Sequence, residues 1–137
     1  RKTSSLVILG DDGLDEFSSH APNRLWVVRD GNVEKITVAP SDIGISSHPS
    51  DVLNGGDAEF NADLVRRVFA NENSEKIAGI VDAVSINAAC AMSAVEAISG
   101  KIDVVESLTR NFAKAKEVIA SGQAAQKLHE WIEASQK

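Results

Sequence analysis

The sequence has one cysteine, no tyrosine, two tryptophans and four phenylalanines among 137 residues. A single cysteine excludes a disulfide within the chain and any metal site built from several thiolates. With so few aromatic rings, a platform for stacking nucleic-acid bases is not expected, and the core must come from alanine, valine, isoleucine and leucine. Cys90 lies among small apolar residues (88–91). We therefore expect a packed core thiol, and a protein of the cytoplasm.

Basic residues are also few. Fourteen lysines and arginines stand against twenty aspartates and glutamates, which gives a net charge of −6. This balance disfavours nucleic acid as a partner, because phosphate backbones select basic surfaces. No basic-then-apolar leader opens the chain, and no stretch approaches the roughly 18 to 20 apolar residues that cross a bilayer. We therefore expect no membrane association. The 43% apolar content is enough for a folded domain.

The front of the chain is β-rich and the back is helical. The apolar run 6–9 ends at Gly10, which predicts a short strand buried on both faces, as in a parallel α/β sheet. Asp30-Gly31 lies between two β-branched runs and predicts a hairpin. The single unit 1–137 then divides into the strand, acidic loop and hairpin of 1–40, a loop over 41–56 that includes an exposed 46–49, and a helical part over 57–137.

Four helices are predicted in the back of the chain. Asp57 is the expected N-cap of the first, and Asp103 caps the third with Glu106 at capping-box spacing. The second helix is the most apolar, so we expect it to be buried nearly all round, and Val84→Asp or Ile80→Asp to prevent folding. The last helix is amphipathic. The stripe expected to pack in the second helix comprises Ile77, Ile80, Val84, Ala88, Ala91, Val95 and Ile98.

Common catalytic patterns are missing from the sequence. It contains no Gly-x-Ser-x-Gly elbow, no Walker A loop and no Gly-x-Gly-x-x-Gly. His20, His48 and His129 are far apart, and we interpret them as two loop histidines and one on a solvated helix face. Gly55-Gly56-Asp57 precedes a helix, but the Asp57 carboxylate would repel a phosphate there, so capping is the better interpretation. No catalytic residue is predicted.

The acidic loop is the exception. Residues 11–16 hold four carboxylates directly after the predicted strand, at the sheet edge where ligands of α/β proteins gather. Asp15 and Glu16 are adjacent hard oxygen ligands, which suit a Mg²⁺ ion that keeps several waters and bridges to a substrate phosphate. On spacing alone a solvated turn is the simpler interpretation, and a metal site is the alternative.

The segment 6–16, LVILGDDGLDE, resembles the strand and Asp-Gly-Leu-Asp-Glu segment of the anthranilate phosphoribosyltransferase family. The similarity continues in register at 55–62, at Asn87-Ala88-Ala89 and at 121–124. It implies the C-terminal part of an α/β domain like those of phosphoribosyltransferases and nucleoside phosphorylases. Such a part would hold a short buried strand, a β-hairpin and about four helices.

The resemblance also implies a reaction. The family consists of glycosyltransferases that join anthranilate to the ribose of phosphoribosyl pyrophosphate (PRPP) in tryptophan biosynthesis and release pyrophosphate. Its Asp-Glu pair binds Mg²⁺, so Asp15 and Glu16 are the predicted metal ligands, and no substrate-binding residue is assigned. Leu9 stands where the family usually has His, and Ala21-Pro22-Asn23 where it commonly has Gly-Pro-Thr. We expect both departures to change the local contacts of the loop without loss of the two metal ligands.

Other parts of the family pattern are missing from these residues. They include the N-terminal helical domain, the Gly-Thr-Gly-Gly-Asp phosphate loop and the anthranilate-binding segments. The chain also begins with Arg1 rather than methionine. We therefore expect a C-terminal fragment, inactive alone, that needs the missing N-terminal half and forms a homo-oligomer. The alternative is a noncatalytic interaction or dimerisation module of the same fold. A relative that binds nucleic acid is disfavoured by the charge.

Overall fold

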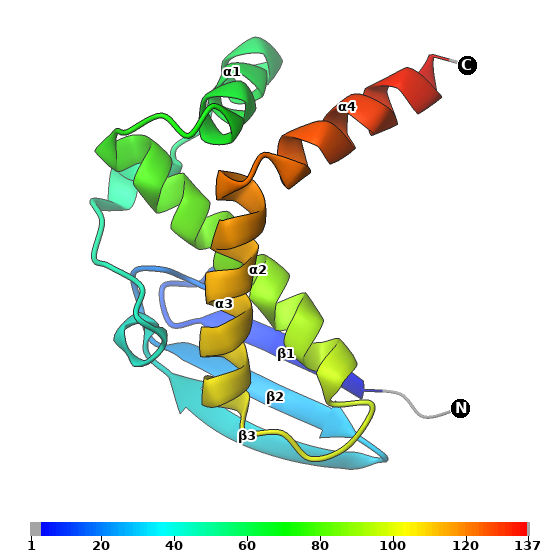
Figure 1. Cartoon of the computed structure of the whole chain (residues 1–137). Coiled ribbons are helices and arrows are strands. Elements are labelled where there is room, and N and C mark those ends of the chain that lie inside the picture. The colour runs from blue at the N-terminus through cyan, green and yellow to red at the C-terminus, as the bar shows by residue number, and fades with distance from the viewer. Residues whose placement is uncertain (1–3, 137) are drawn as a thin grey trace.

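The computed structural model describes residues 4–136, and it is an α/β arrangement in which helices cover one face of a small antiparallel sheet (Figure 1). The predicted fold class is confirmed. The elements, in chain order, are β1 (Ser4–Gly10), β2 (Asn23–Arg29), β3 (Asn32–Val38), the 3-10 turns η1 (Pro40–Ile43) and η2 (Ser50–Leu53), α1 (Ala58–Phe69), α2 (Glu75–Glu96), α3 (Val104–Ala120) and α4 (Gln123–Ser135).

The predicted hairpin joins β2 to β3. In the register of this pair Arg29 lies opposite Asn32, so only Asp30 and Gly31 form the connection. Both have positive φ, 48° and 80°, as a two-residue hairpin turn requires. Gly31 adopts this conformation without a steric penalty, and Asp is among the residues that tolerate it. The sequence signal and the observed turn agree.

The prediction for β1 is wrong in two respects. In the described residues the strand pairs only with β2, and it does so antiparallel, at the edge of the order β1-β2-β3. Its faces also differ, because Leu6 and Ile8 pack toward the core while Val7 is 52% exposed. The run is apolar on both faces, as expected, but elements of the described chain cover only one of them.

The main core lies between the inner face of the sheet and helices α2 and α3. Leu25 of β2, Ile86 of α2 and Leu108 of α3 are completely buried there, and burying each such side chain contributes about 2 kcal/mol. Cys90 lies in the same cluster, and burial raises the pKa of its thiol to about 12. The predicted core thiol is therefore confirmed. A second, smaller cluster joins α1 to α2 and α3; its buried members are Leu64, Val68, Ile77 and Ile119.

Helix α2 is buried on one side only, which corrects the prediction for it. Ile86, Ala89 and Cys90 are buried, whereas Val84 is 53% and Val95 65% exposed. The predicted stripe therefore turns outward over much of its length. The reason is that α3 and the sheet contact the side of α2 that also carries polar residues. The buried polar residues of α2 are Asp82, Ser85 and Ser93.

By length and composition α2 could cross a membrane, so the prediction that no stretch approaches this length is wrong. An 18-residue window of the helix has a mean hydropathy of 1.6. However, 44% of that window is buried inside the protein, and a helix that packs in the core of a soluble domain has the same composition. The extensive packing of α2 against α3 favours the core-helix interpretation.

The exposure of α2 reverses one expectation. We now expect Val84→Asp to change the free energy of unfolding of the 137-residue chain by less than about 1 kcal/mol, because the new carboxylate stays in water. Ile86→Asp, two residues away and fully buried, should abolish cooperative folding, since it buries an unpaired charge. Urea unfolding followed by circular dichroism measures both. Loss of folding in Val84→Asp would show that this side of α2 is covered.

A polar cluster fastens the C-terminal end of α2 to α3. Glu96 accepts hydrogen bonds from the Ser107 hydroxyl at 2.6 Å and from Asn111 Nδ2 at 3.2 Å, and it forms an ion pair with Arg110 at 2.7 Å. The Ser107 hydrogen bond is the largest cause of the lowered pKa of Glu96. Asn111 Nδ2 also donates a hydrogen bond to the Ser93 hydroxyl, inside the interface between α2 and α3. These contacts fix the rotation of α3 on α2.

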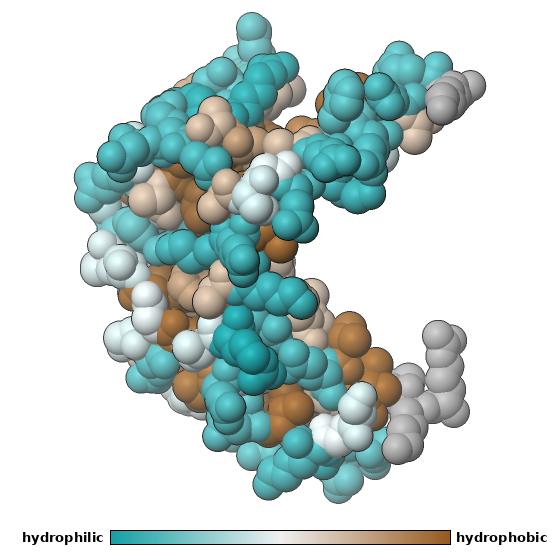
Figure 2. Space-filling model, viewed as in Figure 1, coloured by the Kyte–Doolittle hydropathy of each residue, from teal (hydrophilic) through white to brown (hydrophobic). Residues whose placement is uncertain are grey.

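Helix α4 extends away from the rest of the chain (Figure 1). None of its residues is buried, and Trp131 is 72% exposed. A hollow between α1 and α4 is lined by Val65, Phe69, Leu128 and Trp131. Figure 2 shows apolar side chains at the surface near α4 as well as near the sheet. The predicted amphipathic helix forms, but its apolar side contacts little within the described residues.

Candidate metal site in the acidic loop

The acidic loop, residues 11–22, joins β1 to β2. It opens with a tight turn in which Gly13 N–H donates to the Gly10 carbonyl at 2.9 Å and Gly10 N–H donates to the Leu14 carbonyl at 2.8 Å. Gly10 is required at this point. A Cβ there would lie 2.5 Å from Asp12 Oδ1 and 2.9 Å from Ser18 Cβ. Gly10 therefore lets Asp12 and Ser18 approach its backbone, and the two ends of the loop meet where Asp11 N–H donates to the Pro22 carbonyl at 2.9 Å.

The first two carboxylates of the loop have partners in the protein. Asp11 forms an ion pair with Arg24 of β2 at 2.8 Å. Asp12 accepts a 2.6 Å hydrogen bond from the Ser18 hydroxyl. This bond is the largest cause of the lowered pKa of Asp12, because it stabilises the ionised carboxylate. Both aspartates thus hold the shape of the loop.

Asp15 and Glu16 differ from these two. Both are exposed, and within residues 4–136 neither side chain takes part in a hydrogen bond or an ion pair. Their oxygens therefore remain available as ligands. Two adjacent carboxylates suit Mg²⁺, which keeps several waters and shares its remaining positions with phosphate oxygens. No group of three or more His, Cys, Asp and Glu side chains in the described part of the chain could hold a metal by itself.

The residue after this pair is tied to helix α2. The Phe17 side chain is buried, and its backbone N–H donates to Asn87 Oδ1 at 2.9 Å. Asn87 Nδ2 donates to the Phe17 carbonyl at 3.4 Å and to the Ala83 carbonyl at 3.0 Å. No role was predicted for Asn87. The available signals were its place in the segment Asn87-Ala88-Ala89, which resembles the family, and an amide side chain within a long apolar helix.

The loop closes through Asn23, the last residue of the triplet that departs from the family pattern. This side chain is completely buried. Its Oδ1 accepts from Ser18 N–H at 2.7 Å, and its Nδ2 donates to the carbonyls of Ser18 and Ala21, both at 2.9 Å. Asn23 thus satisfies three backbone groups of the loop. In this chain the departing residue itself supports the turn.

The interpretation of 46–49 as an exposed loop is wrong for His48. Only 9% of its side chain is exposed, and its Nε2 lies 2.9 Å from Asp82 Oδ2. Lys116 Nζ of α3 contacts the other oxygen of Asp82 at 2.6 Å. His48, Asp82 and Lys116 form what we call the Asp82 triad. Gly79 of α2 lets the segment that contains His48 and Val52 approach this helix closely, because a Cβ at Gly79 would lie 2.6 Å from Val52 Cγ2.

The structure also places the other two histidines and the two predicted helix caps. His20 is half-buried in its loop and contacts the Pro49 carbonyl through Nε2 at 3.2 Å. His129 is exposed on α4 and lies 3.2 Å from Glu133. Asp57 caps α1 by accepting a hydrogen bond from Phe60 N–H at 2.9 Å, and Asp103 caps α3 in the same way. The predicted capping roles are confirmed.

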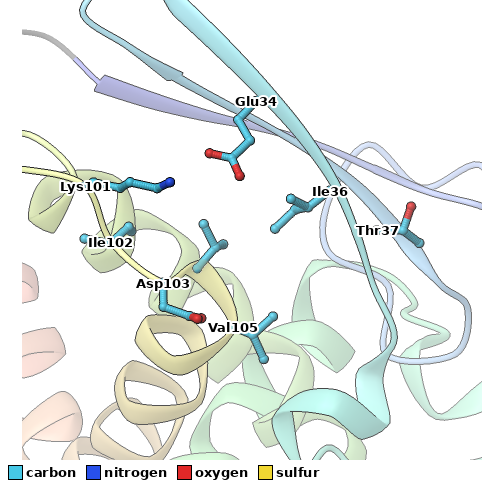
Figure 3. A pocket seen from close by; sticks show the side chains of 8 residues that line it. Glu34, Ile36, Thr37, Lys101, Ile102, Asp103 and Val105 are labelled. Carbon is cyan, nitrogen blue, oxygen red and sulfur yellow. The ribbon is translucent and has the colours of Figure 1, made fainter.

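A separate hollow of about 650 Å³ lies between β3 and the connection from α2 to α3 (Figure 3). Glu34 and Lys101 reach it from opposite sides, and Asp103 at the start of α3 lines its rim. Ile36 and Val105 form part of its floor. Because charges of both signs line this hollow, it offers neither a group of carboxylates for a metal nor a group of cations for a phosphate. The acidic loop therefore remains the candidate site.

Comparison with known proteins identifies the class. The sequence profile of a glycosyl transferase family, described as its a/b domain, matches residues 1–125. The chain belongs to this family. Among curated relatives, the anthranilate phosphoribosyltransferase of Thermobifida fusca is 38% identical over 99% of this chain. The enzyme of that name from Streptomyces griseus is 43% identical over 98% of it. These matches span only 37% and 36% of the respective relatives.

Solved structures agree with the assignment. The anthranilate phosphoribosyltransferase of Thermus thermophilus superimposes with a TM-score of 0.71 at 30% identity, over 94% of this chain and 35% of that one. The Saccharomyces cerevisiae enzyme in complex with PRPP and Mg has a TM-score of 0.74 at 20% identity, over 93% of this chain and 34% of that one. At that identity the yeast structure supports the fold alone.

Proposed function

We propose that this chain supplies the C-terminal part of the α/β domain of an anthranilate phosphoribosyltransferase. The complete enzyme would transfer the phosphoribosyl group of PRPP to anthranilate, release pyrophosphate and serve tryptophan biosynthesis. The observation that carries the proposal is the acidic loop, which presents Asp15 and Glu16 to solvent without a partner among residues 4–136, while the carboxylates beside them support the turn. The relatives matched over nearly the whole chain support the same reaction.

Asp15 and Glu16 are the residues that we propose to hold Mg²⁺. When bound, the ion would neutralise charge that develops on the departing pyrophosphate. The two exposed carboxylates would hold the ion through their oxygens, which are the hard ligands that Mg²⁺ prefers. Mg²⁺ is the choice because adjacent hard oxygen ligands suit it, and Mg is also the metal with which the yeast enzyme was solved. A nucleophilic side chain is not required for the transfer.

The uncovered surfaces of the chain fit a larger domain. Within residues 4–136, one edge of β1 is left unpaired, and the outward side of α2 around Val84 and the outer face of the sheet at Val7 are apolar and exposed. Surfaces of this kind are normally paired or covered. We propose that the N-terminal half of the enzyme covers them and that the chain alone is inactive. We further propose a cytoplasmic homo-oligomer; the buried thiol of Cys90 fits a reducing compartment.

The decisive experiment compares the 137-residue chain, a matching N-terminal half, their mixture and the full-length enzyme. Consumption of anthranilate in the presence of PRPP and Mg²⁺ is followed by its fluorescence. We expect turnover from the full-length protein and from the mixture, and none from either part alone. Binding of the two halves without turnover, together with an inactive full-length protein, would instead favour the noncatalytic interaction module, which the exposed apolar surfaces also support.

A further inference from the structure

We propose that Asn87 of α2 is a positioning residue for the Asp15–Glu16 pair. This inference rests on the proposed function of that pair, and it adds a residue to which no role in the site has been given. One amide side chain contacts both backbone groups of Phe17, the residue directly after Glu16. These contacts join positions that are 70 residues apart in the sequence.

The contact acts on the backbone of Glu16 itself. The Phe17 N–H, which donates to Asn87 at 2.9 Å, belongs to the same planar peptide unit as the Glu16 carbonyl. Holding that N–H therefore fixes the orientation of this peptide plane. The Phe17 side chain is only 2% exposed, so it anchors the next position as well. Glu16 is thus exposed at its tip but immobilised on one side of its backbone.

Asn87 is in turn fixed to a rigid element. Its Nδ2 donates to the Ala83 carbonyl one turn earlier in α2, which selects its rotamer. The neighbouring residues Ile86 and Cys90 are buried in the main core, so this part of α2 cannot shift independently. A ligand pair works best when supporting hydrogen bonds lock its geometry to the scaffold. The geometry assigns this supporting role to Asn87.

The structure also explains why the support must come from α2. At other positions the loop is held from β2, where Arg24 pairs with Asp11 and Asn23 binds Ser18, and His20 contacts the Pro49 carbonyl. Those contacts flank the carboxylate pair without touching its backbone. Of the side chains in the described residues, Asn87 makes the hydrogen bonds nearest in sequence to Glu16. Its removal should therefore loosen the pair while the rest of the loop stays in place.

The test compares Asn87→Ala with Asn111→Ala in the full-length enzyme. Asn111 is a matched control, because it is a buried asparagine within a helix and makes three side-chain hydrogen bonds away from the loop. Both variants should lower the melting temperature. We expect only Asn87→Ala to raise the Mg²⁺ concentration needed for half-maximal activity, by about tenfold or more, as the loss of a supporting contact in a metal site typically does.

A second measurement needs no activity. Hydrogen exchange of the Phe17 amide in the 137-residue chain should accelerate at least about tenfold in Asn87→Ala and remain unchanged in Asn111→Ala, because its acceptor is lost only in the former. An unchanged Mg²⁺ requirement in Asn87→Ala, or unchanged exchange at Phe17, overturns the positioning role. If Asp15→Asn and Glu16→Gln also leave the Mg²⁺ requirement unchanged, the proposed metal site itself fails.

Discussion

Asp15→Asn and Glu16→Gln are each expected to lower kcat of the full-length enzyme by about 10² to 10³, the range found when one group that stabilises developing charge is removed. Each substitution keeps the shape of the side chain and removes one charged metal ligand. Because both side chains are exposed and have no partners in the described structure, the melting temperature should stay unchanged. Turnover with saturating PRPP, measured across a Mg²⁺ titration, tests the expectation.

Asp11→Asn serves as the matched control for these variants. It removes a carboxylate from the same loop, but one that pairs with Arg24 at the surface, where an ion pair contributes about 1 kcal/mol or less. We expect nearly normal turnover and an unchanged Mg²⁺ requirement. If Asp15→Asn and Glu16→Gln behave as Asp11→Asn does, the assignment of the metal ligands is wrong.

The Asp82 triad predicts a large effect on stability. Asp82→Ala should lower the free energy of unfolding of the chain by about 3 kcal/mol, because it leaves His48 buried without its acceptor and removes the partner of Lys116. The Asp82 side chain is 5% exposed, whereas that of Lys116 is 45% exposed. Water can therefore solvate the lysine in part after its partner is lost. For this reason the expected loss of unfolding free energy is at the lower end of the range for a broken buried ion pair. Urea unfolding monitored by circular dichroism gives the value.

Glu117→Ala provides the comparison for that measurement. Glu117 follows Lys116 on α3 and is exposed, so its removal should change the free energy of unfolding by no more than about 0.5 kcal/mol. A loss of the same size in Asp82→Ala and Glu117→Ala would mean that the Asp82 triad contributes little. In that case the hydrogen bonds from Lys76 to the Val52 and Asn54 carbonyls and the packing of Val52 against Gly79 would hold this segment on α2.

Local signals in the sequence were sufficient for most of the secondary structure. The Asp30-Gly31 turn and the caps at Asp57 and Asp103 each depend on residues within a few positions of one another, and all three are observed. The side of α2 that faces the core could not be read in this way. Its periodic stripe of larger apolar residues was expected inside, whereas the sheet and α3 select the side with Ala89 and Cys90.

The same difference between signals from sequence neighbours and contacts made by the fold applies to the candidate site. Asp15 and Glu16 stand out as neighbours in the sequence, and their role as metal ligands stays a prediction. The contacts of Asn87 with Phe17 and of Asp82 with His48 span 70 and 34 residues. No spacing rule connects such positions, because the fold alone brings them together. A polar residue within an apolar helix was the hint common to Asn87 and Asp82.

The position of Cys90 gives the protein an internal reporter of opening. Its thiol lies between α2 and the sheet, with a pKa near 12, and it is the single cysteine of the chain. A thiol-reactive dye needs both access and the thiolate form, so it would label the folded protein only during excursions that lift the helix from the strands. The labelling rate therefore measures the breathing of the main core directly, without any engineered probe.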